Sequence, residues 1–243
     1  GWAHTYWLMA GLMLIGIAAT LFGPEPDGAV IPPRTLAEAV WGPLRDFFSR
    51  PGALALLSLI VLYKLGDAFA GTLTTAFLIR GVDFSATDVG TINKGFGLVA
   101  TIVGALWGGA WMVKLGLYRS LLWFGVLQAL SNLGFMLLAA AGKNYSLMIF
   151  AVGFENLAGG MGTAAFVAFL MALCSRRFSA TQYALLSALA AIGRVFVGPP
   201  SGLAVEAIGW TSFFFVTFLT ALPGLALLWW LRAQVAALER GVE

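Results

Sequence analysis

The chain has 243 residues, of which 60% are apolar and only 10% are charged, and its net charge is +3. An average soluble domain carries about 25% charged residues, so this composition excludes an ordinary soluble enzyme, a disordered chain and a nucleic-acid-binding protein. The chain has one histidine, His4, which is too few for a histidine-rich metal site. It has one cysteine, Cys174, so an internal disulfide is excluded. We therefore expect no metal and no cofactor.

Seven apolar segments are each long enough to cross a membrane. A spanning helix needs about 20 mostly apolar residues, and backbone groups in lipid must be hydrogen-bonded within the segment. The segments are too long for barrel strands of about 9–11 residues, so the sequence predicts an all-α polytopic membrane bundle. The predicted spans are residues 6–22, 52–79, 88–113, 117–141, 145–173, 181–207 and 210–231.

The chain starts almost directly with the first apolar segment, without a charged leader, and we interpret it as a fragment rather than a signal peptide. Residues 23–50, which follow, are rich in proline and charge. Within them Thr35 and Glu38 fit a capping box. Apolar residues then recur at helical spacing, at Leu36, Val40, Leu44 and Phe47. This pattern predicts a short amphipathic helix on the membrane surface; the alternative is a loosely ordered linker.

Positive residues are distributed unevenly between the two ends of the predicted spans. Lysine and arginine favour cytoplasmic loops, so the end that carries more of them is expected to be cytoplasmic. This places the linker and the C-terminus in the cytoplasm. The cytoplasmic set is Arg34, Arg45, Arg50, Lys114, Arg119, Arg176, Arg177, Arg232 and Arg240, and the opposite set is Arg80 and Lys143.

The second and third predicted spans carry charged side chains within apolar sequence. Such groups are costly in lipid and usually face a protein interior or a water-filled cavity. Lys64 and Asp67 are three residues apart and share a helix face. They form either a mutually neutralising pair or a proton and substrate site. In the third span Lys94 follows Asn93, and it either extends to the membrane interface or joins the polar site.

The fourth and fifth predicted spans carry amides and one acid. Gln128 and Asn132 share a helix face and either bond neighbouring helices or contact a ligand. Glu155, next to Asn156, has no cation on its own helix. It must find a partner elsewhere or be protonated, which makes it a candidate proton carrier. The small residues that follow favour close helix packing; they are Gly159, Gly160 and Gly162.

The sixth predicted span begins at a second candidate capping box, residues 179–182, in which Gln182 is structural. Deeper in this span lies Arg194, a permanent charge suited to carboxylates. We expect Pro199 and Pro200 to interrupt the helix, as in transporters whose bent helices surround a site near the membrane midplane.

Residues 109–116, followed by Arg119, resemble the G-x-x-x-D-[RK]-x-G loop motif of the major facilitator superfamily. Val113 replaces the aspartate of that motif, so the salt bridge assigned to it is not expected here. Longer stretches resemble the AmpG-type muropeptide permeases within this superfamily, and the likeness covers most of residues 1–232. The stretches are residues 63–70, 89–95, 124–132, 155–168 and 178–194.

This resemblance implies a domain organisation. Residues 1–22 would be the last transmembrane helix of an N-terminal half. Residues 23–50 would be a cytoplasmic linker, and residues 51–243 the six-helix C-terminal half. The partner of this bundle would then be the missing N-terminal half of the same transporter.

The resemblance also implies proton-coupled import of anhydro-muropeptides, which are cell-wall fragments, across the bacterial inner membrane. We expect protons, membrane lipid and the muropeptide as partners, and no nucleic acid. Asp67 and Glu155 would carry protons, while Lys64, Lys94 and Arg194 would pair with charges or hold substrate. The hydrogen bonds would come from Asn93, Gln128, Asn132 and Asn156.

Three alternatives remain from the sequence. One is a major-facilitator transporter of another polar solute, such as a peptide, a sugar or an acyl-coenzyme A. The second is a membrane enzyme acting on lipid-linked sugars, which would need a polar catalytic cluster at a membrane surface; His4 is isolated in the sequence. The third is a scaffold or sensor, but a scaffold gains nothing from charges inserted in lipid.

Overall fold

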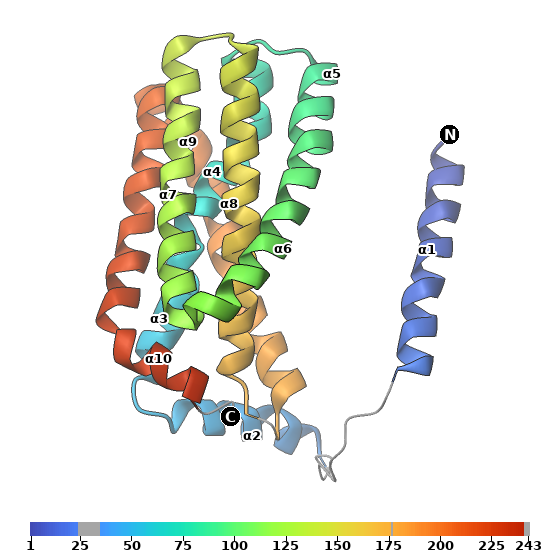
Figure 1. Cartoon of the computed structure of the whole chain (residues 1–243), viewed down its shortest axis with the longest axis vertical. Coiled ribbons are helices and arrows are strands. Elements are labelled where there is room, and N and C mark those ends of the chain that lie inside the picture. Colours follow the sequence, from blue (N-terminus) through green and yellow to red (C-terminus); the bar gives the residue numbers. More distant parts are fainter. Residues whose placement is uncertain (24–34, 176, 241–243) are drawn as a thin grey trace. The chain divides into compact units, whose positions relative to one another are not determined.

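The computed structural model describes residues 1–23, 35–175 and 177–240. Within these ranges all regular structure is helical and no strand occurs, which confirms the predicted all-α class (Figure 1). The elements are α1 (Trp2–Phe22), α2 (Leu36–Phe48), α3 (Ala53–Tyr63), α4 (Leu65–Ala76), η1 (Phe77–Gly81), α5 (Ala86–Val89), η2 (Gly90–Phe96), α6 (Gly97–Leu115), α7 (Leu117–Ala141), α8 (Tyr145–Ala172), α9 (Ser179–Trp230) and α10 (Arg232–Arg240).

The chain divides into two compact units, residues 1–34 and residues 35–243. In the first unit α1 is a single apolar helix with no buried residue. Its 21 residues rise about 1.5 Å each, which is enough to cross a hydrocarbon core of about 30 Å. The predicted first span is therefore present and starts at Trp2. The proline-rich residues 24–34, including Arg34, lie outside the described part of the chain.

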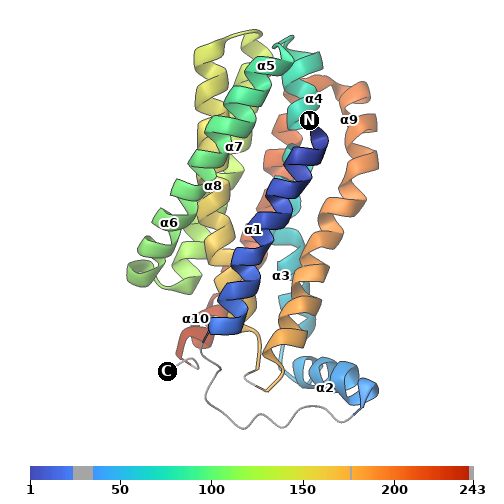
Figure 2. The same cartoon turned by 90° about the vertical axis from the view of Figure 1, so that its right-hand side faces the viewer.

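The last two predicted spans are joined in α9, which is continuous over 52 residues except at Gly209. A straight helix of that length would extend about 78 Å, more than twice the hydrocarbon thickness. Gly209 has φ 73° and ψ 167°, a conformation open to glycine because it has no Cβ. The ribbon reverses there (Figure 2), so α9 consists of a first arm (residues 179–208) and a second arm (residues 210–230). With this division the described residues contain the seven predicted spans.

The predicted interruption at Pro199 and Pro200 is wrong, because the first arm stays helical through both residues. Proline removes a backbone donor, but its position does not end this helix. The hydroxyl of Ser201 donates to the carbonyl of Val197, one turn earlier. The chain breaks instead at Gly209, where the conformation requires a glycine.

Two other predicted spans contain irregular turns that the sequence analysis did not predict. The span at 52–79 is divided at Lys64, which has φ −95° and ψ 0° and separates α3 from α4. The span at 88–113 begins with α5 and continues through η2, a π-helical turn that contains Asn93 and Lys94. Such π-helical turns are frequent at functional sites. Both interruptions therefore coincide with charged residues predicted for the site.

Within the second unit α6 packs tightly on α8 through glycines. A Cβ added to Gly104 would overlap the carbonyl oxygen of Leu157, and one added to Gly160 would overlap the carbonyl oxygen of Thr101. The predicted packing role is confirmed for Gly160. For Gly159 it is wrong, because a Cβ there would meet nothing within 4 Å.

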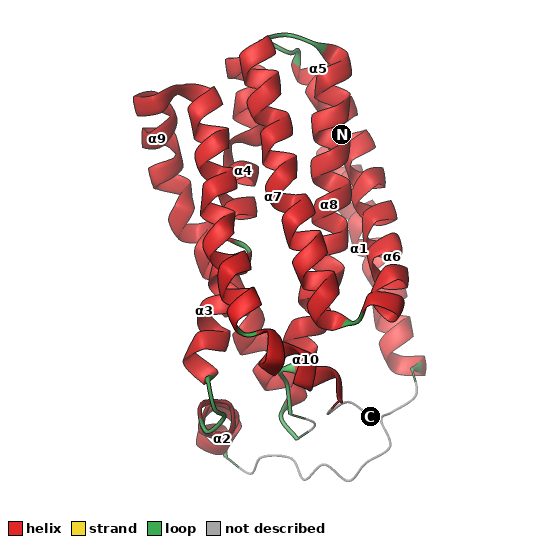
Figure 3. Ribbon diagram, turned by 60° about the vertical axis from the view of Figure 1, so that its left-hand side comes forward, coloured by secondary structure: helices red, strands yellow, loops and turns green. Residues whose placement is uncertain are grey.

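The predicted amphipathic helix is confirmed as α2, which lies across the ends of the spanning helices (Figure 3). Thr35 caps it by accepting a hydrogen bond from the backbone N–H of Glu38 at 3.1 Å. Arg50, just beyond α2, forms an ion pair with Asp46 at 2.8 Å and donates to the carbonyl of Leu173, at the end of α8. These contacts attach α2 to the bundle.

The predicted capping box at residues 179–182 is wrong, since Phe178 precedes the first turn of α9 and no side chain caps it. Gln182 is structural through other contacts. Its carbonyl accepts from the backbone N–H of Ser175 at 2.6 Å, and its amide donates to Asp46 at 2.8 Å. Burial raises the pKa of Asp46, but hydrogen bonds from Gln182 and Arg50 outweigh it, so this pKa lies below its usual value.

Most of the positive residues outside the predicted spans lie at one end of the second unit. The turn between α6 and α7 meets α10 there, because Glu239 accepts from the backbone N–H of Leu117. The opposite end holds the turn between α7 and α8, where Lys143 donates to the carbonyl of Asp83. Arg176, assigned to the positive end from the sequence, lies outside the described residues. The end that carries α2 and α10 holds Arg45, Arg50, Lys114, Arg119, Arg177 and Arg232, and the other end holds Arg80 and Lys143.

Candidate functional site

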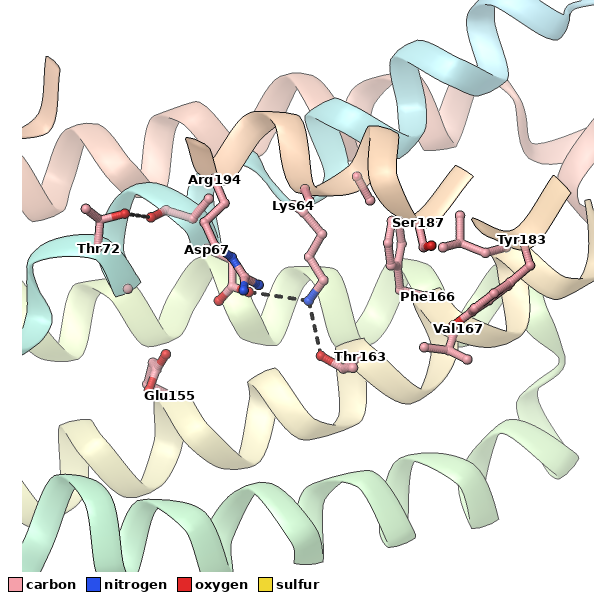
Figure 4. Close-up of a pocket in the computed structure, with 15 residues that line it drawn as sticks. Lys64, Asp67, Thr72, Glu155, Thr163, Phe166, Val167, Tyr183, Ser187 and Arg194 are labelled. Carbon is pink, nitrogen blue, oxygen red and sulfur yellow. Dashed lines mark hydrogen bonds and ion pairs between the residues drawn. The ribbon is translucent and has the colours of Figure 1, made fainter. Parts of the chain in front are cut away.

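A cavity of about 580 Å³ lies between α4, α8 and the first arm of α9, and Lys64, Asp67, Glu155 and Arg194 all line it. Lys64 and Asp67 come from the interruption between α3 and α4 and from the first turn of α4. Glu155 comes from α8, and Arg194 from the first arm of α9. Four of the nine predicted site residues therefore meet in one cavity. We call it the charged cavity (Figure 4).

Lys64 and Asp67 form an ion pair across the helix interruption. The Nζ of Lys64 lies 3.3 Å from Oδ2 of Asp67 and 3.3 Å from the hydroxyl of Thr163 on α8. It also lies 5.8 Å from the ring centroid of Phe166. The side chain of Lys64 is 16% exposed and that of Asp67 is 31% exposed. The two residues thus neutralise each other and still line the open cavity, so both interpretations of the pair stay compatible with the geometry.

Glu155 is half-buried and accepts a hydrogen bond from the amide of its neighbour Asn156 at 2.8 Å. Its carboxyl group interacts electrostatically with the charges of Asp67, Lys64 and Lys94. No ion pair of Glu155 within 4.0 Å occurs in the described part of the chain. Its carboxyl group is therefore inside the bundle without a directly bound cation.

Arg194 is exposed within the unit, and its guanidinium points into the charged cavity (Figure 4). Among the described residues it has neither a hydrogen bond nor an ion pair. A guanidinium offers five donors in a fork that matches a carboxylate. Arg194 can therefore bind an anionic group that enters the cavity.

The charged cavity has a charged end and an aromatic end (Figure 4). Phe166 and Tyr183 line the aromatic end, together with the hydroxyl of Ser187. Phe166 stacks on Tyr63 with ring centroids 5.5 Å apart and planes 2° apart, which fixes the orientation of its ring. A ligand that fills the cavity therefore meets ionic groups on one side and a ring face on the other.

Five predicted site residues are not among those that line the charged cavity. Gln128 and Asn132 are buried, and their amide nitrogens have no hydrogen-bond partner within the described residues. Asn156 accepts from the hydroxyl of Thr101 on α6 at 3.0 Å. Asn93 and Lys94 lie in η2, and Lys94 is exposed. A contact of these five with a ligand stays a prediction.

The sequence analysis missed the uncharged lining residues, although their spacing carries a signal. Thr163, Phe166 and Leu170 follow Glu155 at 8, 11 and 15 residues, which are positions on one helix face. Tyr183 and Ser187 precede Arg194 by 11 and 7 residues and share its face. Extending a helix face from each charged residue would have found them.

An acidic residue of α10 contacts the loop that resembles the major-facilitator motif. Val113 is 86% exposed, so the position of the motif aspartate makes no buried contact here. The carboxylate of Glu239 on α10 instead accepts the backbone N–H of Leu117, at the start of α7. Acidic groups are favourable at a helix N-terminus, so α10 holds this turn.

The helices and the charged cavity define a class: a multi-pass α-helical membrane protein with ionic groups gathered inside the bundle. No family model matches the chain. It is 59% identical over 228 residues to the anhydromuropeptide permease of Escherichia coli, an alignment covering 94% of this chain and 46% of the permease. The chain spans about half the length of the curated relatives it matches.

More distant relatives give the same result. A Rickettsia felis protein designated AmpG 4 is 36% identical over 81% of this chain and 47% of its own length. A Haemophilus influenzae protein without an assigned role is 36% identical over 94% of this chain and 56% of its own length. The resemblance predicted from the sequence is thus confirmed: over the aligned residues the chain is similar to the AmpG-type permeases.

Proposed function

We propose that this chain forms part of a proton-coupled transporter that imports anhydro-muropeptides across the bacterial inner membrane, and that it is not an enzyme. The name of the Escherichia coli relative supports the substrate, and the positive residues at the end with α2 and α10 support a cytoplasmic linker and C-terminus. Residues 51–243 would be the C-terminal half of a major-facilitator fold, with residues 1–22 the last helix of the other half and residues 23–50 the cytoplasmic linker.

One observation carries the proposal: Lys64, Asp67, Glu155 and Arg194 line a single cavity within helices that are long enough to span the membrane. Ionisable groups at membrane depth are costly unless they face water or each other, and in transporters they mark proton and substrate pathways. A cavity that is partly open rather than enclosed also suits a substrate path between two halves that alternate in access. The partner in that path would be the N-terminal half.

The roles follow from the contacts. Protonation of Asp67 would remove its charge and free Lys64, which lies 3.3 Å away, to bind an anionic group of the substrate. Glu155, which has no directly bound cation, would be the second proton carrier. Arg194 would hold a carboxylate of the muropeptide peptide, because its donors are unused. Thr163 and Ser187 would bond sugar hydroxyls.

The test is uptake by a chimera, in which the matching 228 residues of the Escherichia coli permease are replaced by those of this chain. Cells without their own permease receive labelled anhydro-muropeptide with or without a protonophore. Asp67→Asn and Glu155→Gln should each abolish gradient-driven uptake. The matched controls are Asp83→Asn and Glu206→Gln, exposed acids outside the cavity, and they should retain uptake.

Two outcomes would contradict parts of the proposal separately. Full uptake by both cavity variants would remove the proton-carrier roles of Asp67 and Glu155. Uptake that is blocked by a peptide, a sugar or an acyl-coenzyme A, but not by anhydro-muropeptide, would replace the substrate and leave the transporter class intact.

A further inference from the structure

A second cavity, separate from the charged cavity, lies between α2 and the first arm of α9. Its volume is about 220 Å³, and Gln182 is its only polar lining residue among those the structure describes. The rest of its wall is hydrocarbon or aromatic, contributed chiefly by Phe47, Phe48, Leu57, Leu185, Leu186 and Leu189. We call it the apolar groove.

Gln182 offers the apolar groove no free donor. Its amide nitrogen donates to the carbonyl of Pro43 at 3.0 Å and to Asp46 at 2.8 Å, and its oxygen accepts from Ser175. An ordered water in a protein typically makes two to four hydrogen bonds, and the described residues in the wall of the groove offer it no free donor. The apolar groove therefore suits a hydrocarbon ligand.

The position of α2 says which hydrocarbon is available. This amphipathic helix lies across the ends of the spanning helices (Figure 3) and exposes the rings of Trp41 and Phe48. Helices of this kind lie at the boundary between lipid headgroups and acyl chains, with their apolar face about 5–10 Å deep. Lipid acyl chains are the hydrocarbon found at that depth.

Two exposed arginines lie close to the apolar groove. Arg45 follows the lining residue Leu44 on α2. Arg177 lies 5.1 Å from the ring centroid of Phe178, and that ring packs against Gly42 of α2. Arg177 also lies 4.0 Å from Glu38, with 66% of its side chain exposed. Guanidinium groups bind phosphate through paired donors, so the rim favours an anionic headgroup.

We propose that the apolar groove binds an acyl chain of an anionic glycerophospholipid, whose phosphate contacts Arg45 and Arg177. The acyl chain packs between α2 and the first arm of α9, and the headgroup lies on the surface that α2 shares with the membrane. This site is independent of the transport proposal, because none of its lining residues lines the charged cavity.

The experiment counts lipid bound to the purified chain by native mass spectrometry during titration with phosphatidylglycerol, or with phosphatidylcholine of the same acyl chains. Leu185→Trp fills the apolar groove. Leu203→Trp places the same side chain at an exposed position elsewhere on the first arm and is the matched control. The double variant Arg45→Gln and Arg177→Gln leaves the groove intact and removes both cations.

We expect the unchanged protein to bind phosphatidylglycerol more tightly than phosphatidylcholine. Leu185→Trp should weaken both, roughly fourfold for each methylene displaced, and Leu203→Trp should weaken neither. The double variant should lose roughly fivefold in phosphatidylglycerol affinity for each arginine. It should lose less phosphatidylcholine affinity, because the choline cation of that lipid already neutralises its phosphate. If Leu185→Trp fails to fold, the double variant still tests the proposal.

Equal lipid binding by the unchanged protein and the double variant would overturn the headgroup contacts. Equal binding by Leu185→Trp and Leu203→Trp would overturn the acyl-chain site. If Leu185→Trp lowers the melting temperature while lipid binding is unchanged, another part of the protein covers the groove, and the proposal is wrong.

Discussion

Along α8, one side lines the charged cavity and the other sides pack against neighbouring helices. Glu155 and Thr163 lie on the cavity side, while Gly160 meets the backbone of α6 and Gly162 meets the side chain of Gln128 on α7. Asn156, which accepts from Thr101 on α6, is a polar residue of α8 on the packed side. The neighbouring helices make the difference between the two sides. Polar atoms of α8 are enclosed where α6 and α7 pack closely against it, and they line the charged cavity on the side that faces α4 and α9.

Among the predicted effects of substitution, the largest is expected for a residue that lines the charged cavity, and it concerns substrate binding. Hydrogen bonds to charged groups contribute about 1.5–3 kcal/mol, so Arg194→Gln should lower the apparent affinity for anhydro-muropeptide roughly ten- to a hundredfold in the uptake chimera. Arg194→Lys keeps the charge and should lose less. Unchanged affinity in the glutamine variant would mean that this side of the cavity does not contact the substrate's anionic group.

The packed side predicts a loss of stability. A methyl group on Gly104 would overlap Leu157 of α8, so Gly104→Ala should lower the free energy of unfolding by about 1–3 kcal/mol. Gly109→Ala on the same helix meets nothing within 4 Å and should be neutral, or stabilising by up to about 1 kcal/mol. Thermal denaturation in detergent measures both. Equal midpoints would show that α6 and α8 are not closely packed.

Replacing a buried amide is expected to change stability less than Gly104→Ala does, and to increase it rather than decrease it. The amide nitrogen of Gln128 has no partner within the described residues, and an unsatisfied buried donor is destabilising. Gln128→Leu should therefore leave the melting temperature unchanged or raise it slightly. A clear decrease would indicate that the amide bonds a group which the described residues do not supply.

The smallest effect on stability is expected at the end of α8, where Arg50 donates to the carbonyl of Leu173. The same arginine forms an ion pair with Asp46 of α2. The pKa of Asp46 is below its usual value in the folded chain. A depressed acidic pKa stabilises above the unfolded value, about 3.9 for aspartate, and the stabilisation is lost as the pH falls through the folded pKa.

Hydrogen exchange of the α2 amides should therefore be constant near neutral pH and faster, after correction for intrinsic rates, only below about pH 4. Asp46→Asn should remove that acid-dependent step, while Asp83→Asn should keep it. An acid step that persists in Asp46→Asn would assign it to another group. The effect is small because the Asp46 side chain is 37% exposed and solvent screens its ion pair.

The spans were predictable because the bilayer requires a long apolar run whatever the neighbours are. The breaks were less predictable. Gly209 lay between two predicted spans, but the interruption at Lys64 carries no proline or glycine signal at that residue. Pro199 and Pro200 predicted a helix interruption, but the helix continues through both residues. Where a helix breaks depends on the helices around it, and one sequence does not contain their positions.

The site was predictable where charge was involved and not elsewhere. Asp67, Glu155 and Arg194 are so costly in lipid that a common cavity was expected, and all three line one. Amides cost less to bury, so Gln128 and Asn132 fit a packed interface as well as a cavity. Gln182 resembled a helix cap in sequence, yet its contacts are with α2 and Ser175, residues whose proximity only the fold provides.

The interruption at Lys64 has a mechanical consequence. Lys64 caps α4 and Asp67 lies in its first turn, and the carbonyl of Lys64 accepts the backbone N–H of Ala68 at 2.9 Å. The two charges therefore belong to the same helical turn, on the α4 side of the joint. A change of direction between α3 and α4 at this residue would carry the ion pair along with α4.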